Sequence, residues 1–343
     1  MDRPKIHTMS ELSAQIGVSR PTLSRYFQNK TLVRKSTVTK IERLLKGVDY
    51  IPNFYATRMN RKASGLIGVI IPHFSDLFFT SLLEVIEEAA RLADYTIVTQ
   101  SANGDPALEA QAIERLRSMN ADGVIIAPLA QNNALSMLQK VNSEMPTVFV
   151  DSQPSERMSG IDFVGTDNAQ SVATMVDYLC RSGTAPAFLG MPRLNSNSRA
   201  REVVYEDRIV ELGHQPQFVD TNDIEETWQF EAFGYGVMND HFGHGRYVNS
   251  TILCANDRIA IGAIHAANRH GLFEEKAGGL RIAGHDDHPL SRYMSPALTT
   301  VAQDVGAIGN AAVQRLIGRI KQTNPTKPLT LLHSATLVLR ESA

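Results

Sequence analysis

The chain has 343 residues, a formal net charge of −2, 43% hydrophobic residues and 20% charged residues. This composition is typical of soluble globular proteins and excludes a disordered chain or a fibrous repeat, and the length allows two or three domains. No apolar run reaches the ~18 residues of a membrane span, the first residues do not resemble a secretion signal, and the two cysteines cannot form a disulfide framework. We therefore expect a cytoplasmic protein that has no membrane partner.

The charge is distributed unevenly along the chain. Residues 1–62 contain thirteen Lys or Arg and four Asp or Glu, a net charge of +9, whereas the remaining 281 residues carry a net charge of −11. A small basic segment on an acidic protein is typical of a segment that binds a polyanion such as nucleic acid. A solvated basic tail would have the same charge, so the pattern inside the segment has to decide.

The basic segment has the periodicity of short helices. Residues 10–16 form an amphipathic stretch that ends at Gly17, and Ser19 and Pro21 are favourable residues at the start of a second helix. A third helix is predicted over residues 35–45, where apolar residues recur at helical spacing. Two short helices joined by a tight turn, with a third packed across them, predict a helix-turn-helix.

From Leu66 onwards, after a linker at residues 50–59, short apolar strands alternate with helices. Such strands are typical of parallel sheets covered by helices on both faces. A first run of four strands is followed by a second run that begins at Phe163, which predicts two doubly wound lobes of similar size. The predicted strands are 66–71, 96–98, 123–126, 147–150, 163–165, 187–189, 218–219, 251–254 and 281–283.

Polar and aromatic side chains follow these strands, at the edge where such sheets bind ligands. Carboxylates, amides, guanidinium groups and rings in one cleft suit a polyhydroxylated ligand such as a sugar. The residues at this edge are Asp76, Phe78, Asp151, Asp167, Arg199, Arg201, Trp228, Asn256, Asp257 and Asp286. An Asp after a strand can equally be the N-cap of the next helix, which leaves Asp167 and Asp257 open, and Trp228 could be core or cavity wall.

The sequence contains no motif of a metal site, a cofactor site or an enzyme. The segment 285–288, His-Asp-Asp-His, resembles a metal-binding cluster, but alternate side chains of an extended segment point apart. A glycine-rich dinucleotide motif, a phosphate-binding loop, a Gly-x-Ser-x-Gly turn and a His-Glu-x-x-His pair are all absent from the sequence. We expect no metal, no cofactor and no catalytic activity.

Three segments, set in this architecture, resemble the lactose-repressor/galactose-repressor (LacI/GalR) family of bacterial transcription regulators over nearly the full length. They are Gly-Val-Ser-Arg-Pro-Thr-Leu-Ser-Arg at 17–25, Tyr-Ile-Pro-Asn-x-x-Ala at 50–56 and Ala-Asn-Asp-x-x-Ala-x-Gly-Ala at 255–263, and residues 296–301 and 339–342 add to them. The resemblance implies an N-terminal all-α helix-turn-helix domain and an α/β body of two doubly wound parallel-sheet lobes, similar to periplasmic binding proteins.

The implied domains are a helix-turn-helix at 1–48, a hinge helix or linker at 49–64, and an effector-binding and dimerisation body at 65–343. Within the body, the resemblance implies an N-lobe at about 65–162 and 291–324 and a C-lobe at about 163–290 and 325–343. The hinge segment would become helical in the minor groove at the centre of the DNA site.

The resemblance also implies residues for each site. The DNA-binding candidates are Thr8, Ser19, Arg20, Pro21, Thr22, Ser24, Arg25, Asn53, Ala56 and Met59. From the same resemblance and from the strand ends, the effector-binding candidates are Asp76, Phe78, Asp151, Arg199, Arg201, Trp228, Asn256, Asp286 and Gln303.

The implied function is a homodimeric repressor of a carbohydrate uptake or catabolism operon. It would bind a pseudo-palindromic operator in double-stranded DNA and respond to a small sugar or sugar derivative between the lobes, with the three aspartates favouring a neutral ligand over an anion. Two alternatives remain: a sugar-binding receptor of a transport system without a DNA function, and an enzyme that acts on a sugar or nucleotide in the cleft. The sequence leaves open whether the effector is an inducer or a corepressor.

Overall fold

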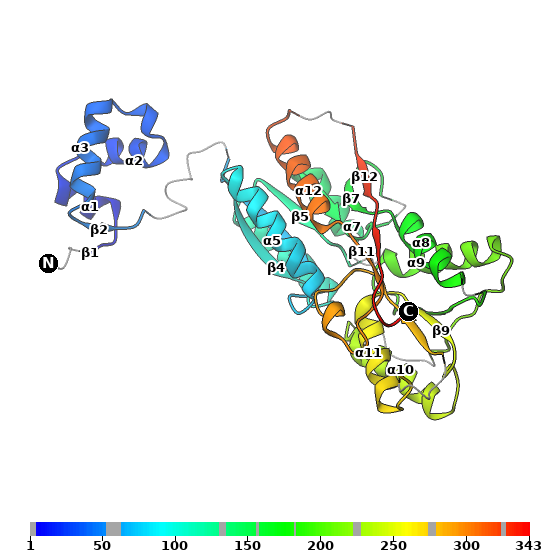
Figure 1. Cartoon of the computed structure of the whole chain (residues 1–343). Coiled ribbons are helices and arrows are strands. Elements are labelled where there is room, and N and C mark those ends of the chain that lie inside the picture. Colours follow the sequence, from blue (N-terminus) through cyan, green and yellow to red (C-terminus); the bar gives the residue numbers. More distant parts are fainter. Residues whose placement is uncertain are drawn as a thin grey trace. The chain divides into compact units, whose positions relative to one another are not determined.

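The computed structural model of the chain (Figure 1) divides into two compact units, Met1–Leu66 and Ile67–Ala343. We call the first unit the head and the second the body. The residues that the structure describes are 5–52, 63–129, 135–155, 158–181, 183–221, 228–273, 279–323 and 327–343.

The head is a three-helix domain with its own core. Its elements are β1 (Lys5–Ile6), α1 (Met9–Ile16), α2 (Arg20–Gln28), the 3-10 helix η1 (Lys30–Leu32), α3 (Lys35–Leu45) and β2 (Asp49–Tyr50). One fully buried apolar side chain from each α-helix meets the others at the centre of the core: Leu12, Leu23 and Ile41. The two short strands pair in parallel and hold the two ends of the domain together. The predicted helix-turn-helix is confirmed.

The turn between α1 and α2 follows from local sequence signals. Thr8 caps α1 by accepting a hydrogen bond from the Glu11 amide at 3.1 Å, and the Glu11 carboxylate accepts one from the His7 amide at 3.0 Å. Gly17 ends α1 with a φ of 63°, a left-handed conformation that other residues adopt only with strain. Pro21 lies in the first turn of α2, where no amide donor is needed.

The first lobe of the body is built on a six-stranded parallel sheet. Its strands, in spatial order, are β12 (Thr330–His333), β7 (Asp162–Thr166), β6 (Thr147–Val150), β5 (Gly123–Ile126), β3 (Leu66–Ile71) and β4 (Thr96–Ser101). Helices α5 (Leu77–Leu92) and α12 (Val305–Ile320) pack on one face of the sheet, and α6 (Pro106–Ser118) and α7 (Leu135–Glu144) pack on the other. The central strands are buried on both faces, as their continuous apolar sequences predict.

The second lobe has a three-stranded parallel sheet in the order β10 (Arg281–Ala283), β9 (Thr251–Cys254) and β8 (Ala187–Leu189). Four helices surround it: α8 (Asn168–Cys180), α9 (Ser196–Glu211), α10 (Phe230–Gly243) and α11 (Asp257–Arg269). A Cβ on Gly262 of α11 would lie 2.1 Å from the Glu231 carbonyl oxygen of α10, so only glycine lets the two helices approach this closely. The remaining elements are the 3-10 helix η3 (Ser291–Tyr293) and an antiparallel pair of β11 (Thr300–Ala302) and β13 (Thr336–Val338).

The two-lobed α/β body is confirmed, but two strands differ from the prediction. The sequence predicts that the strand at Phe163 begins the second lobe, which is wrong: β7 pairs with β6 and β12 in the first sheet. Its apolar residues suit either sheet, because the sequence of a strand does not determine which strand it pairs with. The strand predicted at 218–219 is reduced to one isolated bridge between Phe218 and Phe188. In Figure 1 the consecutive strands β12 and β13 are the red segment of the chain that extends along both lobes.

Candidate functional site

The exposed face of α2 carries the polar residues predicted to contact DNA. Arg20, Pro21 and Arg25 are exposed, Ser24 is half-buried, and Leu23 points into the core on the opposite side. The arginine at 20 and the serine at 24 are one helical turn apart, as are Pro21 and Arg25, so all four belong to one surface strip. A basic helix face of this kind fits the major groove of DNA.

Three further candidates surround this strip. The exposed Ser19 precedes α2, and its hydroxyl lies 2.8 Å from that of Thr22. Thr8 is exposed and caps α1. The predicted DNA contacts Asn53, Ala56 and Met59 lie outside the described residues.

The second candidate site is a cavity between the two lobes of the body. It is lined from the first lobe by Asp76, Phe78, Phe79 and Asp151, and from the second lobe by Met191, Asn195, Asn197, Arg201, Trp228, Phe230, Asn256 and Asp286. Trp228 and Phe230 lie at the start of α10, and the other residues follow β3 and β6 on one side and β8, β9 and β10 on the other. The cavity therefore lies at the carboxyl ends of the strands of both sheets, as expected for open α/β sheets.

Asp76 links the two lobes at one edge of this cavity. It caps α5 by accepting a hydrogen bond from the Phe78 amide at 3.0 Å through Oδ1, and its Oδ2 accepts one from Nη1 of Arg258 at 3.0 Å. Arg258 also donates two hydrogen bonds to Glu231, at 2.8 and 2.7 Å. Burial raises the pKa of Asp76, and Arg258 opposes this shift.

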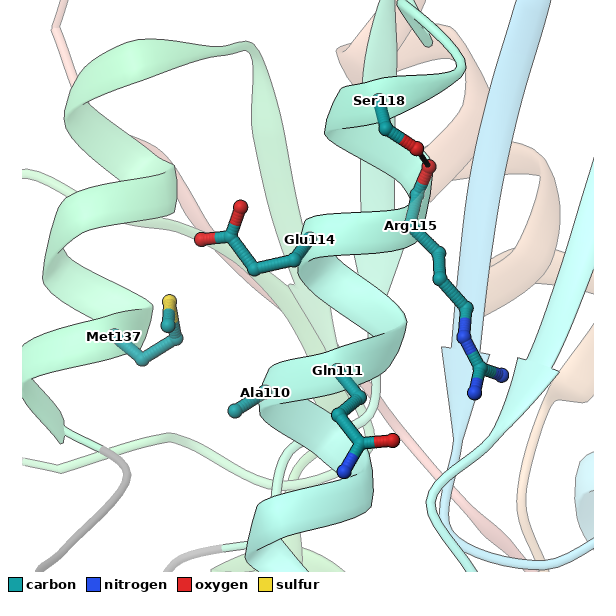
Figure 2. A pocket seen from close by; sticks show the side chains of 6 residues that line it. All are labelled: Ala110, Gln111, Glu114, Arg115, Ser118 and Met137. Carbon is teal, nitrogen blue, oxygen red and sulfur yellow. Dashed lines mark hydrogen bonds between the residues drawn. The ribbon is translucent and has the colours of Figure 1, made fainter.

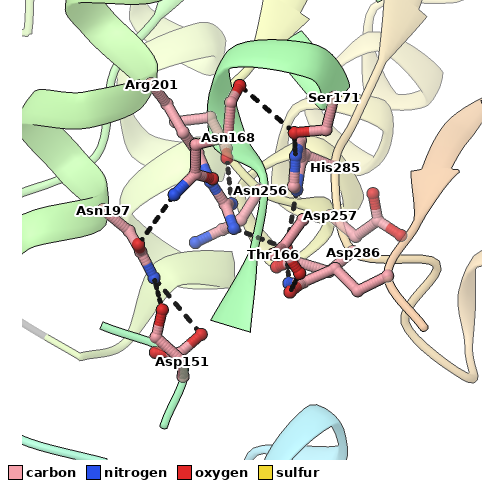
Figure 3. Close-up of polar contacts among 12 residues, drawn as sticks. Asp151, Thr166, Asn168, Ser171, Asn197, Arg201, Asn256, Asp257, His285 and Asp286 are labelled. Atoms are coloured by element: carbon pink, nitrogen blue, oxygen red, sulfur yellow. Dashed lines mark hydrogen bonds and ion pairs between the residues drawn. The ribbon is translucent and has the colours of Figure 1, made fainter. Parts of the chain in front are cut away.

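Asp151 forms a second contact between the lobes. Its Oδ1 accepts a hydrogen bond from the Asn197 side-chain amide at 3.2 Å (Figure 3). Burial, together with the nearby Asp286 and Asp76 carboxylates, raises the pKa of Asp151 to about 7, although Arg201 acts in the opposite direction. The backbone of Asp151 has a φ of 63°, an unusual conformation for a residue other than glycine that is often found at functional sites.

Asp286 lies at the centre of the hydrogen-bond network drawn in Figure 3. Its Oδ1 accepts from Nη2 of Arg201 at 2.9 Å, Nδ1 of His285 at 2.8 Å and Nε2 of Gln303 at 2.7 Å. Burial favours the neutral acid, but Arg201 and the hydrogen bonds outweigh it and lower the pKa of Asp286. Asp286 also lines the cavity, so this ionised carboxylate can accept a hydrogen bond from a ligand there.

Ser171, His285 and Asp286 are joined like a Ser-His-Asp triad. The Ser171 hydroxyl lies 2.8 Å from Nε2 of His285, and burial followed by Arg201 lowers the pKa of this histidine to about 4. The neutral ring thus donates from Nδ1 to Asp286 and accepts at Nε2. Ser171 is fully buried and does not line the cavity, so the arrangement positions Asp286 and offers no accessible nucleophile.

The structure brings most predicted ligand contacts together. Asp76, Phe78, Asp151, Arg201, Trp228, Asn256 and Asp286 line the cavity. Gln303 contacts it indirectly, because it binds Asp286 and accepts a hydrogen bond from the Thr166 hydroxyl. Arg199 does not line it: its side chain is 58% exposed and pairs with Glu202 at 2.8 Å. Residues 199 and 201 are two positions apart on α9, roughly 200° around the helix, so both cannot face one cavity.

Five lining side chains are not among the sequence candidates, namely Phe79, Met191, Asn195, Asn197 and Phe230, and neither is Arg258, which binds Asp76. Asn197 lies on α9 and Phe230 on α10, and the position of a strand end does not predict which face of a helix points at the cavity. Arg258 lies in the first turn of α11, directly after Asn256 and Asp257. The two open assignments are resolved as structural contacts. Asp167 caps α8, and Asp257 is fully buried and accepts hydrogen bonds from Ser291 and Thr300.

Arg199 lines a different hollow, beside α8 and α9, together with Asp167 and Val203. An open hollow between α6 and α7 (Figure 2) is lined by Ala110, Gln111, Glu114, Arg115, Ser118 and Met137. Within the described ranges, no three His, Cys, Asp or Glu side chains are gathered as metal ligands would be. Among the same residues, every helix is too short or too polar to traverse a lipid bilayer.

Sequence comparison identifies the family. The profile described as "Bacterial regulatory proteins, lacI family" matches residues 8–53, and "Periplasmic binding proteins and sugar binding domain of LacI family" matches residues 64–328. The chain belongs to the LacI family of bacterial regulatory proteins. This LacI-family protein is a DNA-binding transcriptional regulator with a body of the sugar-binding type, and the family is one of regulators and not of enzymes.

Named relatives and solved structures agree with this assignment. The LacI-family protein is 26% identical to the transcriptional regulator RegA of Clostridium acetobutylicum, over 93% of this chain and 94% of the relative. It is 26% identical to the regulator MalR of Streptomyces coelicolor, over 97% and 96%. The structure of the lac repressor dimer bound to operator and an anti-inducer superposes with a TM-score of 0.82 at 23% identity, covering 98% of both chains, which supports the fold.

Proposed function

We propose that this protein is a homodimeric repressor whose operator affinity is switched by a sugar-like effector bound between the lobes. The observation that carries the proposal is the cavity, in which three carboxylates, Arg201 and three Asn side chains surround a space flanked by aromatic rings. Planar carboxylate, amide and guanidinium groups, which accept or donate hydrogen bonds, suit a ligand with several hydroxyls when apolar rings lie beside them. One similar solved structure, of a periplasmic binding protein/LacI transcriptional regulator from Alkaliphilus metalliredigens, holds D-xylulofuranose; it has a TM-score of 0.67 at 21% identity.

The geometry of the cavity provides a means of switching. Its enclosed space is about 30 Å³, which is room for a few water molecules and less than a sugar ring needs. An effector therefore has to separate groups that now join the lobes, such as Asp76 from Arg258 and Asp151 from Asn197. A ligand that binds one arrangement of the lobes better than the other shifts their equilibrium.

The proposal for DNA binding rests on the exposed face of α2 and the positive charge of the head. Lys and Arg contacts to phosphates give an affinity that falls with salt, whereas Arg20 can read a guanine through its N7 and O6 atoms. A twofold-symmetric dimer requires two half-sites, so the operator should be pseudo-palindromic. We assign the hinge to residues 49–64 and the effector-binding and dimerisation body to residues 65–343.

The test is to sequence the genomic DNA fragments that the purified full-length protein retains at moderate salt. We expect the retained fragments to share one pseudo-palindrome close to genes of carbohydrate uptake or catabolism. If fragments retained with and without a mixture of sugars show no enrichment over random DNA, the proposal of a sequence-specific repressor is wrong.

The role of Arg20 is tested on the motif obtained in this way. Arg20→Ala should lose discrimination at one base pair in each half-site, with a loss of about 1–3 kcal/mol for the preferred base. Binding to DNA without the motif should change little. Competition titrations with operators altered one base pair at a time measure this effect. An equal loss of affinity on all sequences would show that Arg20 contacts phosphate instead.

A further inference from the structure

The charged groups around the cavity do not balance. Asp76, Asp151 and Asp286 line it, but Arg201 is the cationic side chain among the described lining residues. Arg258 approaches from behind and binds Asp76, yet its other two hydrogen bonds go to Glu231. Even with both arginines counted, the carboxylates exceed the guanidinium groups, so the cavity is an acidic site.

The unbalanced negative charge lies on Asp151. Asp286 is paired with Arg201 at 2.9 Å and Asp76 with Arg258 at 3.0 Å, whereas no Lys, Arg or His of the described residues forms an ion pair with Asp151. Asp151 is 8% exposed and lines the cavity, and its recorded side-chain partner is the uncharged Asn197 amide. A buried carboxylate without a cation is costly, which is why its pKa rises to about 7.

The remaining lining residues define what else the ligand must present. The amides of Asn195, Asn197 and Asn256 can donate to and accept from hydroxyl groups. Trp228 and Phe230 line the same cavity, and their ring centroids lie 5.6 Å apart. Aromatic faces attract cations as well as the apolar faces of sugar rings. Amide, aromatic and acidic groups together therefore favour a polyhydroxylated ligand that is positively charged.

We propose that the effector carries a protonated amine, as an amino sugar does, and that this ammonium group binds Asp151 while its hydroxyls bind Asp286 and the amides. This inference rests on the proposed function and narrows the class of its effector. An ammonium group beside Asp151 forms charge-assisted hydrogen bonds, which are about twice as strong as those of a neutral hydroxyl. A sugar acid would add a negative charge beside three carboxylates and is disfavoured.

The experiment compares matched sugars on the full-length protein by isothermal titration calorimetry. Glucosamine, galactosamine and mannosamine are each measured against the parent sugar and the N-acetyl derivative, in which the charge is removed. Phosphate buffer at pH 7 leaves the amines largely charged and Asp151, whose pKa is about 7, partly ionised before the ligand binds. Phosphate also avoids Tris, which is itself an amine with hydroxyls. We expect one amine to bind at least tenfold more tightly than its parent sugar and its N-acetyl form.

The variant Asp151→Asn tests the assignment to this residue. Asn tolerates the positive φ of Asp151 well, so the variant should fold, and an unchanged circular dichroism spectrum verifies this. The preference for the amine should disappear, because Asn cannot carry the negative charge. Asp167→Asn is the matched control: Asp167 caps α8 outside the cavity, Asn is an equally good cap, and the preference should remain.

Each other outcome overturns the inference. Tighter or equal binding of a parent sugar shows that the effector is neutral and leaves the proposed repressor function intact. An amine preference that persists in Asp151→Asn shows that another group holds the charge. If none of the three amines binds, the inference fails, and the proposed function is then judged by the operator experiment alone.

Discussion

The side chain of Glu109 on α6 is a buried carboxylate that has no charged partner among the described residues. It is 1% exposed, its Oε1 accepts a hydrogen bond from the Leu129 amide at 2.9 Å, and its Oε2 has no hydrogen-bond partner. Burial raises its pKa from 4.5 to about 7. Because the folded pKa lies above the unfolded one, the folded state holds a proton that the unfolded state has lost, and stability falls as the pH rises through this range.

Glu109→Gln should therefore stabilise the protein at pH 8. The amide keeps an oxygen for the Leu129 amide and removes the buried charge, which corresponds to a gain in unfolding free energy of about 3 kcal/mol from the pKa difference. At pH 5 the gain should fall below about 1 kcal/mol, since Glu109 is then protonated in the folded state. Urea unfolding at both pH values measures this difference.

The control for this prediction is Glu114→Gln on the same helix. Glu114 is half-exposed and pairs with Arg117 at 2.6 Å, so its replacement should change the unfolding free energy by about 1 kcal/mol or less at either pH. A loss of stability in Glu109→Gln at pH 8 would contradict the prediction, because it would mean that the ionised carboxylate stabilises the folded state.

At the same scale, the residues of the cavity were predictable only in part. The carboxyl end of a strand can be recognised in a sequence, and ligands of open α/β sheets bind at these ends. This reasoning selects Asp76, Asp151 and Asp286, and all three line the cavity. It does not predict which face of the following helix points at the cavity. For this reason the sequence gives no sign of Asn197 and suggests Arg199 together with Arg201. The helical spacing alone would have separated the two arginines.

At the scale of elements, the turn between α1 and α2 determines how the DNA-facing helix leaves the core of the head. Gly17 has a φ of 63° and an added Cβ would meet no atom within 4 Å, so the backbone conformation is the sole constraint. Gly17→Ala should therefore destabilise the head by about 1 kcal/mol through backbone strain. Hydrogen exchange in the full-length protein should show weaker protection of the amides of α1 and α2.

Gly47→Ala provides a control in the same domain. Gly47 does not have a positive φ, and its added Cβ would lie 3.5 Å from the Leu44 carbonyl oxygen, which is an ordinary contact. This variant should leave the protection of α1 and α2 unchanged. Equal effects of the two substitutions would mean that the loss reflects the added methyl group and not the left-handed turn.

Elements that depend on local signals were predicted well, and those that depend on distant partners were not. The cap at Thr8, the turn at Gly17 and the proline at 21 act within one helical turn, so the helices of the head follow from the sequence. β7 joins the first sheet because it pairs with β6 and β12, and β12 lies more than 160 residues later in the chain. A short apolar run identifies a buried strand but does not determine which strand pairs with it.

At the scale of the whole body, a few contacts hold the two lobes around the cavity. Asp76 from the first lobe binds Arg258 from the second, Asp151 binds Asn197, and the ring of His73 lies 5.7 Å from that of Trp228. These pairs are 182, 46 and 155 positions apart in the sequence, so their contact follows from the arrangement of the lobes and from no local pattern. Any effector that changes this arrangement acts on the same pairs.

Arg258→Gln should loosen the contact between the lobes. Removing one partner of a buried ion pair destabilises the folded protein by about 3–5 kcal/mol if the other charge stays buried. Opening of the cleft avoids this cost, because water then solvates Asp76 in place of Arg258. Hydrogen exchange should therefore become faster in the first turn of α5, next to Asp76. Arg208→Gln is the control, because Arg208 binds Asp177 at 2.7 and 2.9 Å within the second lobe. Unchanged exchange in Arg258→Gln would show that the lobes stay together without this pair.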